Sequence, residues 1–92
     1  MKWLVYILLC DQKTYYVGIT NNLDDRIKTH RMKKNIGTKE FSDIRLVYKE
    51  VQVNKLSAAK REKQLKGWTK AKKQALIDGN LELLKKLSLP RA

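Results

Sequence analysis

Two short runs of apolar and aromatic residues near the N-terminus constrain the fold most strongly. The run "KWLVYILLC" (residues 2–10) is rich in branched and aromatic side chains, and "TYYVGIT" (14–20) alternates in character. Only Asp11, Gln12 and Lys13 separate the two runs. Runs of this kind around a short polar turn are typical of a β-hairpin. The sequence therefore predicts two antiparallel strands at the start of the chain.

The length of the turn decides which side chains share a face of this hairpin. With an odd loop of three residues, Tyr6 lies opposite Gly18, Leu8 lies opposite Tyr16, and all four positions share one face. Tyr6 and Tyr16 are then diagonal neighbours, with backbones roughly 7–8 Å apart, so that two hydroxyls can hold a shared phosphate or water. Gly18 would let a ligand or another backbone come close to this face. On spacing alone, the alternative is that both tyrosines are buried structural residues.

The middle of the chain predicts one helix followed by a third strand. Asn21 or Asn22 can cap a helix that extends to about residue 33 and carries acidic residues in its first turn. The run "IRLVYKEVQV" (44–53) then predicts a strand. We expect one domain over residues 1–92, because a chain of this length supports a single hydrophobic core.

The C-terminal half predicts only helices. Asn54 can cap a long helix, which Gly67 and Thr69 interrupt. Gly79 is typical of a helix C-terminus, and Asn80 can cap the segment "LELLKKL". We expect the leucines of this segment to cover the domain's own core, the alternative being a surface for a partner protein. The expected order is strand-strand-helix-strand-helix-helix, an α/β chain of the α+β type.

The charge of the chain indicates a polyanionic partner. Lys and Arg number 21 against 9 Asp and Glu, which gives a formal net charge of +12. Such an excess is typical of nucleic-acid binding and, less specifically, of binding to anionic membranes. No apolar run approaches the roughly 18 residues that span a bilayer, and no signal-peptide cleavage site follows the first run. We therefore expect a cytoplasmic protein without a membrane-spanning segment.

Cysteine and histidine are too few for a structural zinc site. Cys10 is the only cysteine and His30 the only histidine. A zinc site of the usual kind needs four such ligands. Any metal ion must therefore be held mainly by oxygen atoms.

An arginine and the only histidine lie four residues apart on the first predicted helix. At 100° per residue, Leu23, Ile27 and His30 fall within a narrow arc with Arg26 at its edge. We therefore expect Arg26 and His30 to point toward the margin of the sheet. A guanidinium there can bind a phosphate through two donors. The alternatives are an ion pair for Arg26 and simple helix packing for His30.

Glu62 is an isolated acidic residue in a basic segment. It is the only carboxylate between Val51 and Ile77. On a helical wheel it lies beside Ala58 and Leu65, the side that faces the protein. Mg²⁺ usually takes one or two carboxylates with water and substrate phosphate, so one glutamate suffices; an internal salt bridge is equally compatible. The predicted nucleic-acid-binding residues around it are Lys60, Arg61, Lys63, Lys66, Lys70, Lys72 and Lys73.

Together these residues resemble the GIY-YIG nuclease family over nearly the whole chain. The first signature is similar to "LVY" (4–6) and the second to "YVG" (16–18), followed by the Arg and His of "GITNNLDDRIKTH" and the glutamate of "KREKQLKGW". The segment "REKQLKGWTKAKKQALI" is most similar to small stand-alone bacterial members, relatives of the excision-repair incision nuclease domain. The resemblance implies a three-stranded antiparallel sheet flanked by helices. It also implies cleavage of DNA phosphodiesters with a single divalent ion, Mg²⁺ or Mn²⁺.

The resemblance further implies a role for each candidate site residue. Tyr6 would activate the attacking water, Tyr16 would orient water or the scissile phosphate, and Arg26 would stabilise the developing charge. Glu62 would hold the metal ion, and His30 would assist proton transfer. The expected function is a Mg²⁺-dependent DNA endonuclease in repair or recombination, acting on branched, damaged or single-stranded DNA. The alternative is a catalytically weak nucleic-acid-binding module, for which the basic surface suffices.

Overall fold

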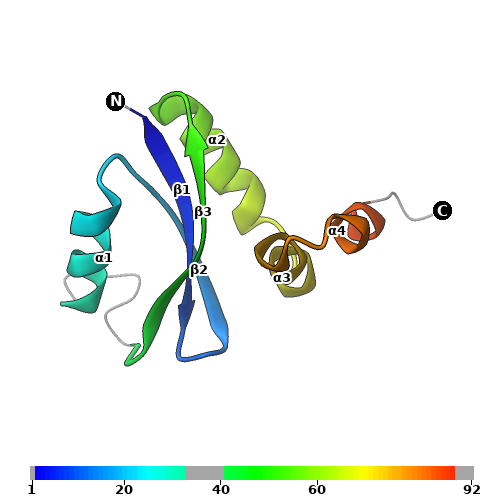
Figure 1. The fold of residues 1–92 in the computed structure, drawn as a ribbon, viewed down its shortest axis with the longest axis horizontal. Helices are drawn as coiled ribbons and strands as arrows, with labels where there is room; N and C mark the ends of the chain where they lie inside the picture. Colours follow the sequence, from blue (N-terminus) through cyan, green and yellow to red (C-terminus); the bar gives the residue numbers. More distant parts are fainter. Residues whose placement is uncertain (1, 33–40, 89–92) are drawn as a thin grey trace.

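A three-stranded antiparallel sheet with strand order β2-β1-β3 lies at the centre of the fold (Figure 1). The computed structural model describes residues 2–32 and 41–88. The strands are β1 (Trp3–Cys10), β2 (Thr14–Thr20) and β3 (Ile44–Gln52). The helices are α1 (Leu23–Arg31), α2 (Lys55–Lys66), α3 (Lys70–Asp78) and α4 (Leu81–Leu87). The predicted fold class is confirmed, with the long C-terminal helix divided into α2 and α3 at the expected interruption.

The β1–β2 hairpin has the register expected for a three-residue loop. Tyr6 lies opposite Gly18, and Leu8 lies opposite Tyr16. Because directly opposed side chains share a face, both tyrosines lie on the same side of the sheet. The geometric condition for a joint tyrosine site is therefore met.

The turn of this hairpin adopts a left-handed backbone without glycine. Asp11 and Gln12 have φ values of 52° and 59°. Positive φ at two central turn residues matches the twist of the flanking strands, but it is uncommon for residues other than Gly, Asn and Asp, so Gln12 is the less usual of the two. The Asp11 carboxylate compensates by accepting hydrogen bonds from the backbone amides of Ser42 (2.9 Å) and Asp43 (2.7 Å). These bonds connect the turn to the chain just before β3.

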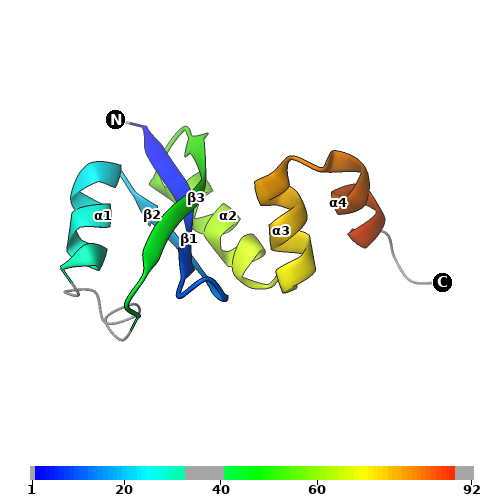
Figure 2. The same cartoon turned by 60° about the horizontal axis from the view of Figure 1, so that its bottom comes forward.

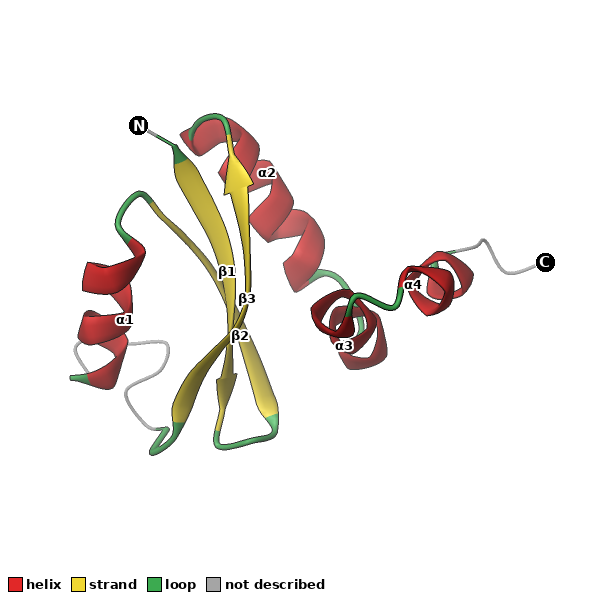
Figure 3. Cartoon of the chain, in the orientation of Figure 1, coloured by secondary structure: helices red, strands yellow, loops and turns green. Residues whose placement is uncertain are grey.

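The sheet has a separate apolar cluster on each face. The cluster beneath α2 and α3 is built on Val5, Ile7, Val17, Ala58 and Leu65. The cluster beneath α1 is built on Tyr6, Leu8, Cys10 and Ile44, with Tyr16 packed against it. Figure 3 shows the resulting layers, with α1 on one side of the sheet and α2 on the other. Both tyrosines therefore belong to the α1 side.

A β-bulge in β3 determines which of its side chains face each helix. Ile7 pairs with Tyr48 whereas the next residue, Leu8, pairs with Leu46, so that Val47 is inserted between the two pairs. Side chains alternate along a strand, and an extra residue reverses the alternation beyond it. Leu46 consequently faces α1, whereas Tyr48 faces α2.

Each helix begins at a residue whose side chain caps its first turn. The side chains of Asn22 and Asn54 accept hydrogen bonds from backbone amides three residues further on, at 3.2 and 2.9 Å. Thr69 caps α3 and Asn80 caps α4 in the same way. The left-handed Gly79, with φ of 69°, ends α3. Within the described ranges, no helix is long and apolar enough to cross a bilayer.

Helix α4 differs from the expectation. It packs mainly against α3, and Figures 1 and 2 show it as the helix farthest from the sheet. Leu81, Leu83 and Leu87 are exposed, and neither apolar cluster of the described residues includes them. The prediction that these leucines cover the domain's own core is therefore wrong, because the turn at Gly79 directs α4 away from the sheet.

Candidate active site

A tyrosine–histidine cluster, consisting of Tyr6, Tyr16 and His30, lies between the sheet and α1. The Tyr6 hydroxyl is 2.9 Å from His30 Nε2. The centroid of the imidazole ring is 5.9 Å from that of Tyr6 and 5.1 Å from that of Tyr16, and both contacts are edge-on. His30 is 0% exposed, so its side chain points toward the sheet and not into solvent. The hydrogen bond to Tyr6 offsets the cost of burying the polar ring beneath α1.

Burial keeps both partners of the central hydrogen bond uncharged. Burial is the main cause that raises the pKa of Tyr6 far above its usual value, and Tyr16 adds to it, while Arg26 acts in the opposite direction. Burial also lowers the pKa of His30 below 6.5, followed by the effect of the Arg26 charge. Because removal from water disfavours the charged form of each group, the phenol and the imidazole are both neutral at pH 7. A neutral imidazole can accept the hydroxyl proton of Tyr6.

Arg26 lies where the tyrosine–histidine cluster meets solvent. Burial raises the pKa of Tyr6, and the positive charge of Arg26 opposes this effect. It also lines an open pocket of about 350 Å³, together with Thr20, Asn21, Asn22, Asp25 and Thr29. None of the three ion pairs within the described residues involves Arg26. The ion-pair alternative thus finds no support there, and the position suits a phosphate ligand.

Glu62 lies on α2, in the layer on the other side of the sheet from α1. This helix packs against β2 and β1, and the negative charge of Glu62 is one of the causes that raise the pKa of Tyr6. Its side chain is 24% exposed and pairs with Lys66, one turn along the helix, at 3.4 Å. Pairs between residues four apart on a helix contribute only about 0.3–0.5 kcal/mol to stability, so Lys66 does not compete strongly with another cation for the carboxylate.

A single accessible carboxylate is compatible with a magnesium ion. No group of three or more His, Cys, Asp or Glu side chains that could hold a metal occurs in residues 2–32 and 41–88. Mg²⁺ does not need such a group, because it keeps several waters and takes one or two carboxylates with substrate phosphate. Glu62, whose side chain is 24% exposed, offers one hard oxygen ligand of this kind.

Gly18 permits close packing of the Tyr6 ring on β2. A Cβ atom at this position would lie 2.5 Å from Tyr6 Cζ and would overlap the hydroxyl. The overlap involves a ring that is buried and hydrogen-bonded, so the ring has little freedom to move away. A side chain at residue 18 is therefore incompatible with the observed position of Tyr6.

Gly18→Ala is expected to lower the free energy of unfolding by about 1–3 kcal/mol, because the added methyl group overpacks the site and displaces Tyr6 from His30. Gly67→Ala is the matched control. A Cβ at Gly67 meets nothing closer than 3.5 Å, and its φ of −81° suits alanine, so this variant should be as stable as wild type or slightly more stable. Denaturant unfolding of the three proteins measures both effects, and equal stability of Gly18→Ala and wild type would contradict the close packing.

The predicted nucleic-acid-binding residues fall into two groups. Most are at least partly accessible to solvent: Lys60, Lys63, Lys66, Lys70, Lys72 and Lys73. Arg61 differs, because its Nε is 3.0 Å from a carboxylate oxygen of Glu50 on β3. The structure thus places Arg61 within the protein fold rather than on a free basic surface.

Lys49 is a further basic residue of the site face that the sequence alone did not indicate. It lies opposite Tyr6 in the β1–β3 pairing, so its exposed side chain shares a face with Tyr6 and Tyr16. This placement depends on the bulge at Val47, without which Lys49 would face α2. No local sequence signal marks it as a site residue.

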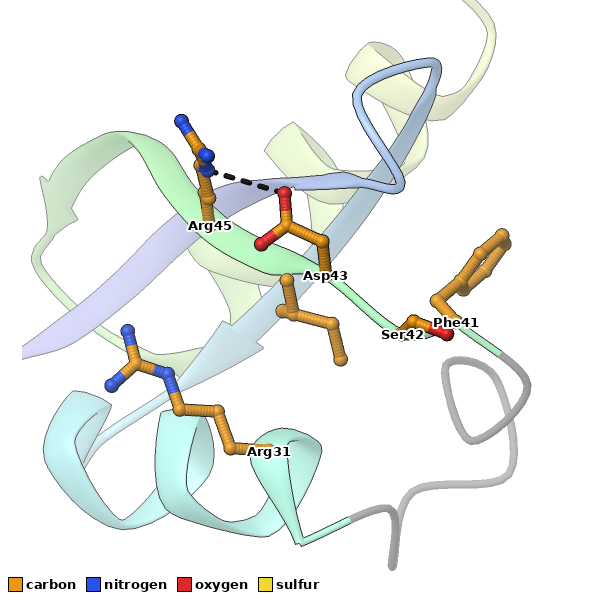
Figure 4. Close-up of a pocket in the computed structure, with 6 residues that line it drawn as sticks. Arg31, Phe41, Ser42, Asp43 and Arg45 are labelled. Carbon is orange, nitrogen blue, oxygen red and sulfur yellow. Dashed lines mark ion pairs between the residues drawn. The ribbon is translucent and has the colours of Figure 1, made fainter.

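A second open pocket lies near the end of α1 (Figure 4). Its volume is about 470 Å³, and it is lined by Arg31, Phe41, Ser42, Asp43, Ile44 and Arg45. The Nε of Arg45 is 3.2 Å from a carboxylate oxygen of Asp43. None of the predicted site residues lines this pocket, so it is separate from the tyrosine–histidine cluster.

Comparisons with known proteins identify relatives along most of the chain. The model of the GIY-YIG catalytic domain matches residues 2–75. The UPF0213 protein SH2523 of Staphylococcus haemolyticus is 35% identical over 78 residues, which are 84% of this chain and 95% of that protein. A UPF0213 protein of Syntrophus aciditrophicus is 38% identical over 83 residues, with 88% of this chain and 95% of that protein covered.

A solved structure shares the fold. The solution NMR structure of the UPF0213 protein BH0048 from Bacillus halodurans is 33% identical in sequence and covers 98% of this chain and 100% of its own, with a TM-score of 0.55. The matched residues 2–75 contain the tyrosine–histidine cluster, Arg26 and Glu62. The chain therefore belongs to the GIY-YIG catalytic domain family, and its function is of the nuclease type.

Proposed function

We propose that the protein is a Mg²⁺-dependent endonuclease that hydrolyses DNA phosphodiesters, acting on branched or damaged DNA in repair or recombination. The observation that carries this proposal is the buried hydrogen bond between Tyr6 and His30, with Tyr16 beside it and the charges of Arg26 and Glu62 acting on the same hydroxyl. This arrangement combines a proton acceptor, a cation for the phosphate and a carboxylate for a metal ion. The net charge of +12 favours a polyanionic substrate.

In the proposed reaction, Tyr6 relays a proton to His30. The attacking water gives a proton to the hydroxyl oxygen of Tyr6 while the hydroxyl proton moves to His30 Nε2. The water oxygen bonds to phosphorus, one ester P–O bond breaks, and the departing oxygen takes up a proton from solvent as His30 releases its own. The raised pKa of Tyr6 favours this relay over a phenolate that exists before the reaction.

The remaining groups act on the phosphate. Arg26 stabilises the negative charge that develops on the phosphate oxygens, since a guanidinium is permanently charged and matches two of them. Tyr16 orients the water or the scissile phosphate. Glu62 would hold the ion, which when bound supplies Lewis acidity at the phosphate. Lys49, exposed on the same face, suits a phosphate that flanks the cleaved bond.

A panel of DNA substrates tests the proposed function. Pure protein is incubated with flap, junction, nicked, single-stranded and plain duplex DNA, with Mg²⁺ and with a chelator. We expect Mg²⁺-dependent cleavage of at least one branched or damaged substrate, and slower cleavage of the plain duplex. Binding of these DNAs without cleavage in Mg²⁺ or Mn²⁺ would instead identify a binding module.

The rate of cleavage is expected to be constant through neutral pH and to fall only in the acid range. His30 accepts a proton only when neutral, and because burial lowers its pKa below 6.5, the loss begins below the usual histidine range. The free energy of unfolding is also expected to decrease as the pH falls below 6.5. The reason is that His30 binds a proton more readily in the unfolded chain than in the folded one.

Single-turnover rates and melting temperatures between about pH 5 and 9 separate the two effects, because only the rate should depend on the protonation of His30 within the fully folded range. A rate that keeps rising toward the pKa of a free phenol would show that phenolate, and not the relay to His30, activates the water.

A further inference from the structure

On helix α2, Arg61 and Glu62 lie on opposite sides of the helix face that packs against the sheet. Ala58 and Leu65 are fully buried and mark the side that faces the sheet. At 100° per residue, Arg61 lies about 60° to one side of Ala58, and Glu62 lies about 40° to the other. Arg61 contacts β3, which is one edge of the sheet, so Glu62 is turned away from that edge. The rotation of α2 about its axis therefore sets the position of the Glu62 carboxylate.

A hydrogen-bond network fastens Arg61 to β3. The Nε of Arg61 donates to both carboxylate oxygens of Glu50, at 3.2 and 3.0 Å. The Tyr48 hydroxyl and the Gln52 amide each donate to one of these oxygens at 2.7 Å. The guanidinium also donates to the side-chain oxygen of Gln64 at 2.8 Å. Each oxygen of Glu50 thus accepts two hydrogen bonds, which holds the carboxylate in one orientation.

The Arg61–Glu50 pair is shielded from solvent and from alternative partners. The two side chains are 24% and 18% exposed. The Arg61 guanidinium carbon lies 5.2 Å from the centroid of the Trp68 ring, in a cation–π contact. Burial raises the pKa of Tyr48 to about 12, and the hydrogen bond to Glu50 adds to this effect. A half-buried pair whose carboxylate accepts four hydrogen bonds resists displacement by phosphate far better than an exposed lysine does.

We propose that Arg61 is a positioning residue: its ion pair with Glu50 sets the rotation of α2 and thereby the position of the Glu62 carboxylate. This inference rests on the proposed function of Glu62 as the metal ligand. With side-chain atoms about 5–6 Å from the helix axis, a rotation of about 10° moves the carboxylate by about 1 Å. A misplacement of that size can lower the rate of a positioned reaction about 100-fold.

Glu50→Gln distinguishes positioning from direct DNA contact. The change keeps the shape of residue 50 but removes the charge that anchors Arg61. Positioning predicts a fall in Mg²⁺-dependent cleavage of about 10–100-fold, with metal-free DNA affinity equal to that of the control Glu82→Gln. Glu82 is an exposed carboxylate on α4, so the control matches the change in net charge. If Arg61 were a phosphate contact, its release would tighten metal-free DNA binding beyond that of the control.

Arg61→Met should lower cleavage as much as Glu50→Gln does, and the double variant should be no worse than either, because the two residues act as one unit. Lys85→Met, at an exposed position on α4 outside the predicted nucleic-acid-binding residues, removes the same charge, is the matched control and should cleave like wild type. Melting temperatures establish that each variant is folded at the assay temperature. Additive losses from the two single changes would overturn the proposal.

A readout independent of cleavage is the broadening of the Tyr6 and Gly18 amide NMR signals by Mn²⁺. We expect broadening in wild type, none in Glu62→Gln, and a clear reduction in Glu50→Gln and Arg61→Met. If wild type cleaves no DNA but this pattern holds, the proposed function fails and the positioning role stands. If the two folded variants keep wild-type broadening and cleavage, or if wild type shows no broadening, the positioning role is wrong.

Discussion

Glu62→Gln is expected to lower Mg²⁺-dependent DNA cleavage by about two to three orders of magnitude. The amide keeps the size of the side chain but lacks the charge that holds a divalent cation. DNA affinity in metal-free buffer should stay equal or increase slightly, because a negative charge is removed from a surface that faces phosphate. Single-turnover cleavage and metal-free binding, measured side by side on wild type and variant, check both statements.

Glu82→Gln on α4 is the matched control and should cleave like wild type. The salt-bridge alternative for Glu62 predicts a different pattern, in which a lower melting temperature accompanies any loss of activity. The Lys66 side chain of its ion pair is 56% exposed, so we expect the stability of Glu62→Gln to stay within about 1 kcal/mol of wild type. Wild-type cleavage by the folded variant would remove Glu62 from the active site.

Tyr6→Phe is expected to lower cleavage by about two to four orders of magnitude, since the phenyl ring cannot relay a proton from water to His30. It should also lower the free energy of unfolding by about 1–3 kcal/mol, because the buried His30 Nε2 loses the Tyr6 hydroxyl as a hydrogen-bond partner. Cleavage under single-turnover conditions and denaturant unfolding measure the two effects separately.

Tyr15→Phe is the matched control for this substitution. Tyr15 is on the same strand as Tyr16 but packs with the cluster beneath α2, and its hydroxyl donates to Gln74 in an exposed position. Loss of the Tyr15 hydroxyl should leave the rate of DNA cleavage per folded molecule unchanged. A Tyr6→Phe variant that cleaves at the wild-type rate would contradict the proton relay, whatever its stability.

The position of the site follows from the layers of the fold. Tyr6 and Tyr16 lie on the α1 side of the sheet, and His30 comes from α1 itself. Glu62 comes from α2, in the layer on the other side of the sheet. Because the charge of Glu62 acts on Tyr6, the site depends on how α2 is fastened to the sheet. The Arg61–Glu50 pair connects α2 to β3, in addition to the apolar contacts of Ala58 and Leu65 with the sheet.

Local sequence alone determined much of this fold. Hydrophobic alternation and a three-residue loop predict the hairpin, and the parity of the loop places Tyr6 and Tyr16 on one face. Asn22 and Asn54 mark helix starts because a capping side chain acts on the adjacent turn and needs no distant partner. The spacing of the candidate site residues along the chain is likewise a property of the sequence alone. Their catalytic roles stay predictions.

Tertiary structure decided the features that depend on contacts between distant segments. The bulge at Val47 arises from the pairing of β3 with β1, and it places Lys49 on the site face and Glu50 beneath α2. His30 is buried because a hydroxyl 24 residues earlier in the chain provides its hydrogen bond. In sequence, nothing distinguishes Arg61 from its basic neighbours, but in the fold it pairs with Glu50, 11 residues earlier in the chain. In each case the sequence gives the identity of the side chain. Its position is stabilised by a group that is distant in the sequence and that only folding brings near.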